Sequence, residues 1–219
     1  MAAGRTLRSR ASSQLRQRAC CKQCGAKYDF FQLMTALSST LIEKFCQHCD
    51  WAEQCWLLRK HLFDENVDRR FLFDARHAHF FNRLALILQE YWLHEVAKLH
   101  DRPKQAGRYN LTIDYILEYG GWEDDVRQRL QAIRTRLVRL ADTIRAARNR
   151  LLSHNDLEII LNEESLGEFE EGADVAYFEA LREYASTVHE ASLGVPYEFD
   201  GLTPNDIEIF MSQFRRGAP

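Results

Sequence analysis

One long apolar stripe constrains the fold of this chain more than any other feature. Its members recur in steps that alternate four and three: Val126, Leu130, Ile133, Leu137, Leu140, Ile144, Ala147, Leu151 and His154. This spacing places all of these side chains on one face of an α-helix. A helix that continues to Ser153 would be roughly 50 Å long at 1.5 Å per residue. Such a helix needs a partner along its length, so the stripe predicts a helical bundle or a dimer seam.

The rest of the apolar pattern is also helical. We expect further helices at about 35–63, 68–99, 113–118, 174–191 and 203–214. Polar or Gly/Pro-rich breaks separate them, at 64–66, 103–110, 120–121 and 194–196, and the loop 162–173 is acidic. The short apolar run 157–161 fits either a helix or a strand. The sequence therefore predicts an all-α fold, with an antiparallel helical bundle as its simplest packing.

Composition limits the class of protein. The apolar content of 46% supports a real core, and no apolar stretch has the length of a membrane span or of a signal peptide. We therefore expect a soluble cytoplasmic protein with no membrane contact. The net charge of −3 excludes a globally basic nucleic-acid binder. A local basic groove stays open, because residues 126–155 hold eight Arg against Asp142 alone.

The amino end differs in composition from the rest. Residues 1–28 hold seven Lys/Arg and no acid, which is typical of a transit peptide or a disordered basic arm. A misassigned start is the alternative, because Met34 opens the first convincing helix and Met1 would then not be the true start. We expect residues 1–33 to form a disordered basic extension and residues 34–219 to form the helical domain.

Two cysteine pairs raise the question of a metal site. Cys21 and Cys24 form one C-x-x-C pair, and Cys46 and Cys49 form the other. This spacing is typical of a four-thiolate zinc site. Against it, the second pair falls inside a helical pattern, where buried cysteines act as small apolar side chains. We predict no metal and no other cofactor, and the sequence leaves the zinc alternative open.

Histidines and acids on the helix 68–99 give a second candidate for a metal. They are Asp74, His77, His79, Glu90, His94 and Glu95. No two of these histidines have the spacing of a His-Glu-x-x-His site. We therefore expect the histidines to pack within the bundle and the charged residues to form salt bridges. The sequence also has no glycine-rich phosphate loop and no Gly-x-Ser-x-Gly segment. It therefore favours neither a kinase, nor a dehydrogenase, nor a serine hydrolase.

The strongest chemical signal is the segment 148–156, with the sequence RNRLLSHND. Arg148 can hold a phosphate with its fixed forked charge, and His154 can act as acid or base near neutral pH. Asn149 can orient the histidine or a phosphate oxygen. Together these groups suit cleavage of a phosphodiester, most plausibly in RNA. The alternative is an arginine-rich helix whose histidine caps or packs at its end.

The same segment resembles the signature of the HEPN superfamily. That signature is an Arg, a polar residue and a His after a gap of four to six residues, and the gap here is five. The segments 96–101 and 110–117 further resemble the abortive-infection, AbiU-type branch. The resemblance covers about residues 40–215. By carry-over, Arg148 and His154 match the catalytic pair, Asn149 matches the polar third residue, and Asp156 matches a recurrent position without a known role.

The resemblance implies a four- or five-helix domain that forms a homodimer, with the two Arg-to-His segments side by side. It further implies a metal-independent endoribonuclease that acts on RNA as a toxin or phage-defence effector, with a partner antitoxin. The alternative within the superfamily is a non-catalytic module that binds a nucleotide, RNA or a protein. A third possibility is a structural helical protein with a zinc-stapled amino end.

Overall fold

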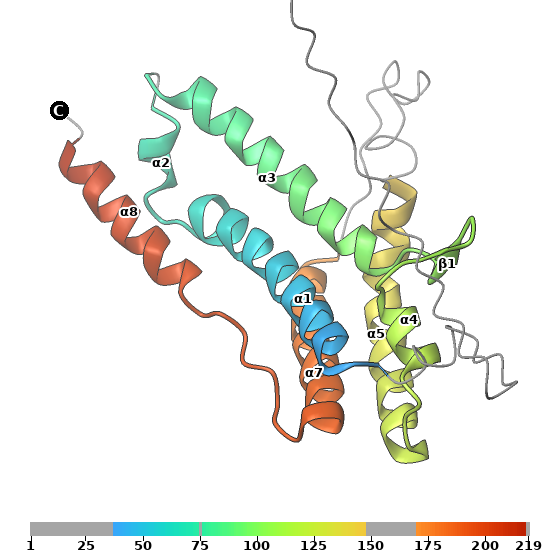
Figure 1. Cartoon of the computed structure of the whole chain (residues 1–219). Coiled ribbons are helices and arrows are strands. Elements are labelled where there is room, and N and C mark those ends of the chain that lie inside the picture. Colours follow the sequence, from blue (N-terminus) through green and yellow to red (C-terminus); the bar gives the residue numbers. More distant parts are fainter. Residues whose placement is uncertain (1–36, 75, 148–169, 218–219) are drawn as a thin grey trace, which may run out of the picture. The chain divides into compact units, whose positions relative to one another are not determined.

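The computed structural model describes residues 37–74, 76–147 and 170–217, and it confirms the all-α prediction. The elements are α1 (Ser39–Arg59), the π-helical turn η2 (Lys60–Asp64), α2 (Arg69–Leu72), α3 (Ala78–Leu99), β1 (Lys104–Gln105), β2 (Arg108–Tyr109), α4 (Ile113–Tyr119), α5 (Asp124–Ala147), α7 (Ala173–Leu193) and α8 (Thr203–Gly217) (Figure 1).

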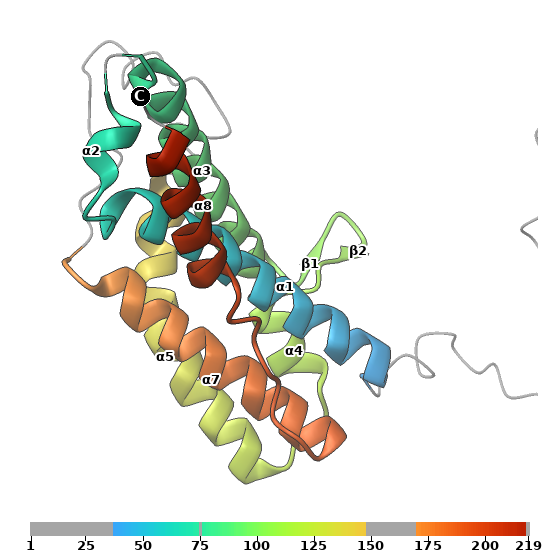
Figure 2. The same ribbon diagram turned by 90° about the vertical axis from the view of Figure 1, so that its left-hand side faces the viewer.

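The main core lies between two antiparallel helix pairs, α1 with α3 and α5 with α7 (Figures 1 and 2). Phe45 and Tyr184 meet edge to face in this core, with ring centroids 6.0 Å apart. Trp56 stacks on Phe178 at 4.5 Å. The Tyr184 hydroxyl donates to the carbonyl oxygen of Ile113 at 2.9 Å, which satisfies its polar end and ties α7 to the start of α4.

Helix α5 contributes the apolar stripe predicted from the sequence. Leu130, Ile133, Leu137, Leu140 and Ile144 are all buried, so the prediction is confirmed as far as Ile144. Asp124 and Asp125 occupy its first turn, where negative charge suits the helix dipole. The stripe members Ala147, Leu151 and His154 lie beyond the described side chains.

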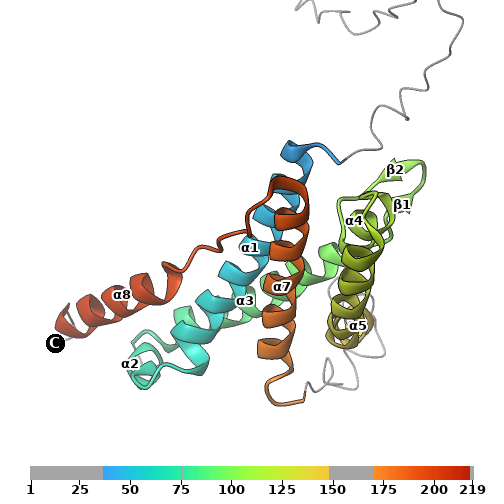
Figure 3. The ribbon, with the colours of Figure 1, turned by 90° about the horizontal axis from the view of Figure 1, so that it is seen from below.

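A smaller core forms where η2, α2, the first half of α3 and α8 meet (Figure 3). Its buried members are Leu62, Phe63, Leu72, Phe81, Ile207 and Met211. Helix α1 reaches this core through η2, where the backbone N–H of Glu65 donates to the carbonyl of Lys60 at 2.9 Å. The first helix therefore ends at Asp64, close to the predicted end at residue 63.

The single helix expected over 68–99 is wrong, because the chain breaks between α2 and α3. The Asp74 carboxylate accepts from the backbone N–H of Arg76 at 3.0 Å. The backbone carbonyl of Asp74 accepts from the N–H of His77 at 2.9 Å. Aspartate can bond to the backbone nearby in this way and so compete with a helix. The apolar periodicity from Phe81 onward is nevertheless helical, as predicted.

The segment 103–110 contains a short hairpin where the sequence predicted a loop. Strands β1 and β2 pair in antiparallel register, with Lys104 opposite Tyr109 and Gln105 opposite Arg108. The two turn residues both have positive φ, 49° at Ala106 and 78° at Gly107. Two-residue hairpin turns of this kind match the right-handed twist of the strands.

Two further predictions fall on residues outside the described ranges. These are the extension 1–33 and the apolar run 157–161. The division at residues 33 and 34 therefore stays a prediction. Among the helices that the structure does describe, none is both long and apolar enough to cross a membrane.

Candidate functional site

The predicted catalytic segment follows directly on the last residue of α5. Arg148, Asn149, His154 and Asp156 lie outside the described residues. Their roles stay predictions. The structure does describe the part of α5 that leads to them, together with the α7 and α3 residues around its final turns.

Two ion pairs hold α5 on either side of its buried stripe. Arg134 reaches across to α4, and both of its contacting nitrogens bond to the carboxylate of Asp114, one of them at 3.2 Å. On the other side, Arg136 pairs with Glu183 of α7. Both pairs are partly exposed, so each contributes little to stability. Their main consequence is to orient the helix between its neighbours.

Several arginines occupy exposed positions along α5. Arg127, Arg129 and Arg139 are exposed, and no acidic side chain in the described part of the chain forms an ion pair with them. Asp142 is the one acid of α5 beyond its first turn. The helix therefore carries exposed arginines along the described part of its length, and the two-residue separation places Arg127 and Arg129 on different sides of it. A surface of this kind attracts a polyanion even when the whole chain is slightly acidic.

A polar cavity of about 450 Å³ opens between the last turns of α5 and the first turns of α7. Its walls are Arg136, Arg139, Leu140, Thr143, Glu170, Ala173, Ala176, Tyr177 and Glu179. Arginines come from the α5 side and carboxylates from the α7 side. The volume is within the usual range for small-ligand sites. Thr143 lies five residues before Arg148 in the sequence, so the cavity borders the part of α5 that leads toward that residue in the chain.

A buried histidine–tyrosine pair adjoins this cavity. His100 Nε2 lies 3.0 Å from the hydroxyl oxygen of Tyr177, and both side chains are buried. Burial raises the pKa of the Tyr177 phenol well above its ordinary value, so the phenol stays protonated. This pair is not predicted from the sequence. Its only signal was the position of His100 inside the segment 96–101, which was used as a landmark for the family.

Cys46 and Cys49 are fully buried in the main core, on the side of α1 that faces α7. The Cys46 thiol lies 3.6 Å from the carbonyl oxygen of Ala185. Burial raises the pKa of Cys46 to about 12 and that of Cys49 well above its ordinary value. A zinc ligand must be a thiolate, which this environment disfavours. These two cysteines therefore act as small core residues, and Cys21 and Cys24 lie outside the described residues.

The histidines and acids of α3 do not gather at one place. His79 accepts from Arg83 Nε at 3.0 Å, while the ring of His77 packs against Phe81 and Phe214. Glu95 is buried and pairs with Lys98 at 2.6 Å and with His48 at 3.3 Å. Within 37–74, 76–147 and 170–217, no three His, Cys, Asp or Glu side chains are grouped so as to hold a metal ion.

Comparison with known proteins gives one finding. The model of a protein family, HEPN AbiU2, matches residues 34–211 of this chain. The match includes the described helices as far as Met211 in α8, and it also spans the segment 148–156. Searches of curated proteins and of solved structures give no significant match.

Proposed function

The chain belongs to the HEPN AbiU2 family, and from that premise we propose that it is a metal-independent endoribonuclease acting as an abortive-infection toxin. His154 accepts the proton of a ribose 2′-hydroxyl or donates one to the departing 5′-oxygen. Arg148 stabilises the negative charge that develops on the phosphorus oxygens, and Asn149 orients the histidine or the phosphate.

The reaction is an internal transfer at phosphorus. The 2′-oxygen attacks phosphorus, the bond from phosphorus to the 5′-oxygen breaks, and one proton passes from the nucleophile to the leaving group. The products carry a 2′,3′-cyclic phosphate and a free 5′-hydroxyl. Two copies of the segment 148–156 meet in one groove of a homodimer, and an antitoxin protein restrains the activity.

The observation that supports this proposal best is the division of α5 into buried apolar positions and exposed basic ones. Its apolar face is buried from Leu130 to Ile144, which anchors the helix in the bundle. Its exposed positions include Arg127, Arg129 and Arg139, which offer positive charge to an RNA strand. Arg148 follows at the end of this helix in the sequence, where the anchored helix would hold it beside the bound strand.

The decisive experiment compares purified wild-type protein with His154→Ala and Arg148→Ala on total RNA in the presence of EDTA. We expect the cleavage rate to fall ~10²–10⁴-fold without the histidine and ~10²–10³-fold without the arginine. His94→Ala and Arg216→Ala, at exposed positions on α3 and α8, serve as matched controls. A His154→Ala protein that cleaves as fast as wild type would contradict the proposal.

A second measurement tests whether the exposed arginines of α5 bind RNA, separately from the cleavage reaction. The triple substitution of Arg127, Arg129 and Arg139 by Gln should weaken the binding of single-stranded RNA to His154→Ala protein. It should also flatten the dependence of log affinity on log salt by about 0.7 for each lost phosphate contact. An unchanged salt slope would mean that RNA does not lie along this helix.

The alternative function, nucleotide binding without cleavage, is favoured by one observation. The polar cavity between α5 and α7 has a suitable volume, and its walls contain two arginines, a threonine, a tyrosine and two glutamates. Under this alternative, ATP or GMP binds with an affinity that Arg139→Ala reduces, and RNA in EDTA stays intact with wild-type protein. Cleavage of RNA by wild-type protein, lost in His154→Ala, would decide for the nuclease.

A further inference from the structure

Three helices carry apolar or mainly apolar stripes with the same spacing on one side of the molecule. The stripes are Trp51, Cys55, Leu58 and Leu62 on α1 and η2; Phe80, Leu84, Ile87 and Tyr91 on α3; and Thr203, Ile207, Phe210 and Phe214 on α8. Each has steps of four, three and four residues, which is the heptad spacing of helices that pack lengthwise. We call this surface the α1–α3–α8 face.

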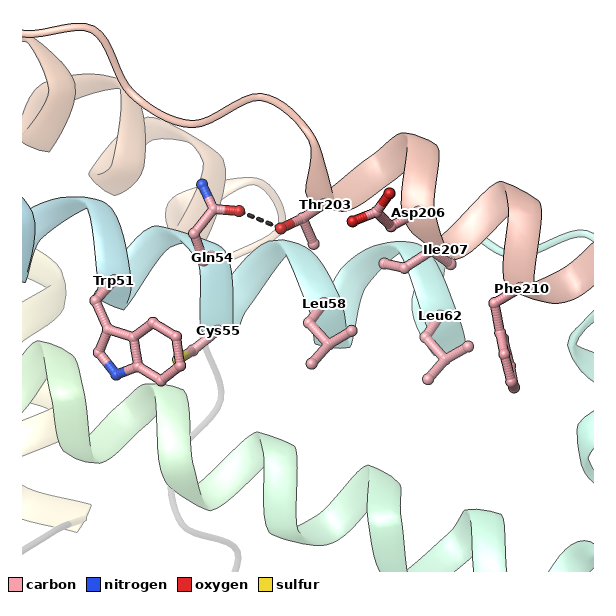
Figure 4. Close-up of a pocket in the computed structure, with 9 residues that line it drawn as sticks. All are labelled: Trp51, Gln54, Cys55, Leu58, Leu62, Thr203, Asp206, Ile207 and Phe210. Carbon is pink, nitrogen blue, oxygen red and sulfur yellow. Dashed lines mark hydrogen bonds between the residues drawn. The ribbon is translucent and has the colours of Figure 1, made fainter.

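The centre of the face is a groove of about 400 Å³ over α1 (Figure 4). Its floor comes from the α1 stripe, and its wall on one side comes from α8, where Phe210 projects beside Leu62. Helix α3 packs against α1, and Tyr91 of its stripe contacts Trp51, which lines the groove. Trp51 Nε1 donates to the Tyr91 hydroxyl at 3.4 Å, and the two rings meet edge to face with centroids 6.4 Å apart.

The face leaves much aromatic surface in water. Trp51 is 52% exposed, Phe80 63%, Tyr91 42% and Phe210 43%. Together these amount to about two fully exposed aromatic side chains, or ~300–500 Å². Ile87 adds to this surface, because it is 60% exposed. This area is comparable to the largest apolar patch of a typical monomeric protein, and such a patch is often functional.

We infer that the groove receives α3 from a second copy of this chain, in an antiparallel and reciprocal arrangement. A two-fold axis at the middle of the α3 stripe places Phe80 opposite Tyr91 of the second copy and Leu84 opposite Ile87 of the second copy. Each α3 then lies beside the groove of its own copy and occupies the groove of the second copy. Such a self-complementary contact is the usual geometry of a two-fold dimer.

The area supports a second copy as the occupant. A stable interface buries about 800 Å² on each partner. The exposed aromatic rings of the face supply about half of this area, and Ile87, the half-buried Leu58 and Leu84 and the polar rim supply more. The occupant also needs a helix with apolar residues at the spacing of the groove, and the α3 stripe of a second copy has that spacing.

Charge on the flank of α3 fits the same arrangement. Arg83 and Glu90 are both exposed and lie seven residues apart, so they share one flank of the helix. In the antiparallel pair, Arg83 of each copy approaches Glu90 of the other. The contact therefore brings opposite charges together twice.

The face is separate from the end of α5 that the proposed function uses, since its stripes come from α1, η2, α3 and α8. Wild-type protein and Ile87→Glu are compared by light scattering after gel filtration. We expect the mass of the wild-type particle to halve in the variant, whether or not the end of α5 forms a dimer of its own. The dissociation constant should rise at least ~30-fold, as for a residue at the centre of an interface.

Val195→Glu is the matched control, because Val195 is 55% exposed but lies outside the face. It should leave the mass unchanged. Circular dichroism and thermal unfolding of all variants verify that the fold is intact. A wild-type chain that is monomeric, or an Ile87→Glu chain with the mass of wild type, would overturn the inference. So would a copurified protein of another sequence whose release, rather than loss of a second copy, accounts for the change in mass.

A charge exchange tests the antiparallel pairing itself. Arg83→Glu and Glu90→Arg should each weaken self-association, because each places like charges together. The double variant should restore the association to within a few-fold of wild type. If the double variant associates no better than the singles, the pairing of α3 with its copy is wrong.

Discussion

The two halves of α3 are similar in apolar content and opposite in burial. From Trp92 to Leu99 almost every side chain is covered, including Trp92, Leu93, Glu95, Val96, Ala97 and Leu99. From Ala78 to Tyr91 only Phe81 is buried. In that first half Phe80, Leu86, Ile87 and Tyr91 remain in contact with water.

The difference comes from what packs against each half. The second half lies against α1 and contributes to the main core together with α5 and α7. The first half packs on the smaller core of η2, α2 and α8, and at its end Tyr91 contacts the exposed Trp51 of α1. The apolar character of a side chain therefore does not by itself decide whether that side chain is buried. A helix whose apolar content exceeds what its own fold can cover is prepared to bind something else.

The largest expected effect comes from a truncation in the covered half. Leu99 is fully buried, so Leu99→Ala should lower the free energy of unfolding by about 2–5 kcal/mol through lost burial and a cavity. Leu86 is 64% exposed, and Leu86→Ala should change it by less than about 0.5 kcal/mol. Urea unfolding followed by circular dichroism measures both. Equal losses would contradict the contrast between the two halves.

A smaller effect is expected at the polar anchor of the covered half. The Glu95 carboxylate is buried and Lys98 Nζ lies 2.6 Å from it, so Lys98→Ala leaves a buried charge with His48 as its remaining partner. The free energy of unfolding should fall by about 1–3 kcal/mol, which is the cost of an incompletely satisfied buried polar group.

Adding Glu95→Gln to Lys98→Ala should recover part of that loss, because no charge is then buried. Glu90→Ala in the exposed half is the control and should change the free energy of unfolding by less than about 0.5 kcal/mol. If Glu90→Ala costs as much as Lys98→Ala in the same urea titration, the anchor does not distinguish the halves.

The smallest effect is a pH dependence carried by His48, which contacts the covered half through Glu95. Burial and the nearby Lys98 charge lower the pKa of His48, and they outweigh the attraction of Glu95. In the unfolded chain His48 takes up a proton near pH 6.5, whereas in the folded protein it takes up the proton only at lower pH. Stability contributed by this group is therefore present above about pH 6.5 and is lost as the pH falls through the folded pKa.

The slope from one such proton is at most about 1.4 kcal/mol per pH unit. Unfolding free energies measured from pH 8 to pH 5 should therefore fall less steeply for His48→Gln than for wild type. Lys98→Ala should raise the pKa of His48, which NMR titration of the ring can follow. Identical pH profiles for wild type and His48→Gln would show that this histidine is not linked to folding.

Much of the fold could be predicted from local pattern. The stripe on α5 was predicted residue by residue and is confirmed as far as Ile144. The break at Asp74 was missed, because a turn of a few residues competes with the helix there and leaves the apolar period almost unchanged. The hairpin after Pro103 was missed because it rests on two residues with positive φ, one of them an alanine.

The residues of the candidate site also divide into those that the sequence indicates and those that it does not. Arg148, Asn149 and His154 were found from a short motif and remain predictions. The His100–Tyr177 pair was not found, since its members are 77 residues apart and meet only when α7 packs on the end of α3. The spacing of Cys46 and Cys49 fitted both a metal site and core packing, and burial in the main core favours core packing.

The sequence by itself determined where most of the helices form and which face of each is apolar, because helical periodicity is a property of neighbours along the chain. Only the tertiary structure decided which of those faces are covered. Burial depends on segments that are distant in sequence, and periodicity holds no information about them. That is why Leu99 and Ile87, both apolar positions on α3, end in such different surroundings.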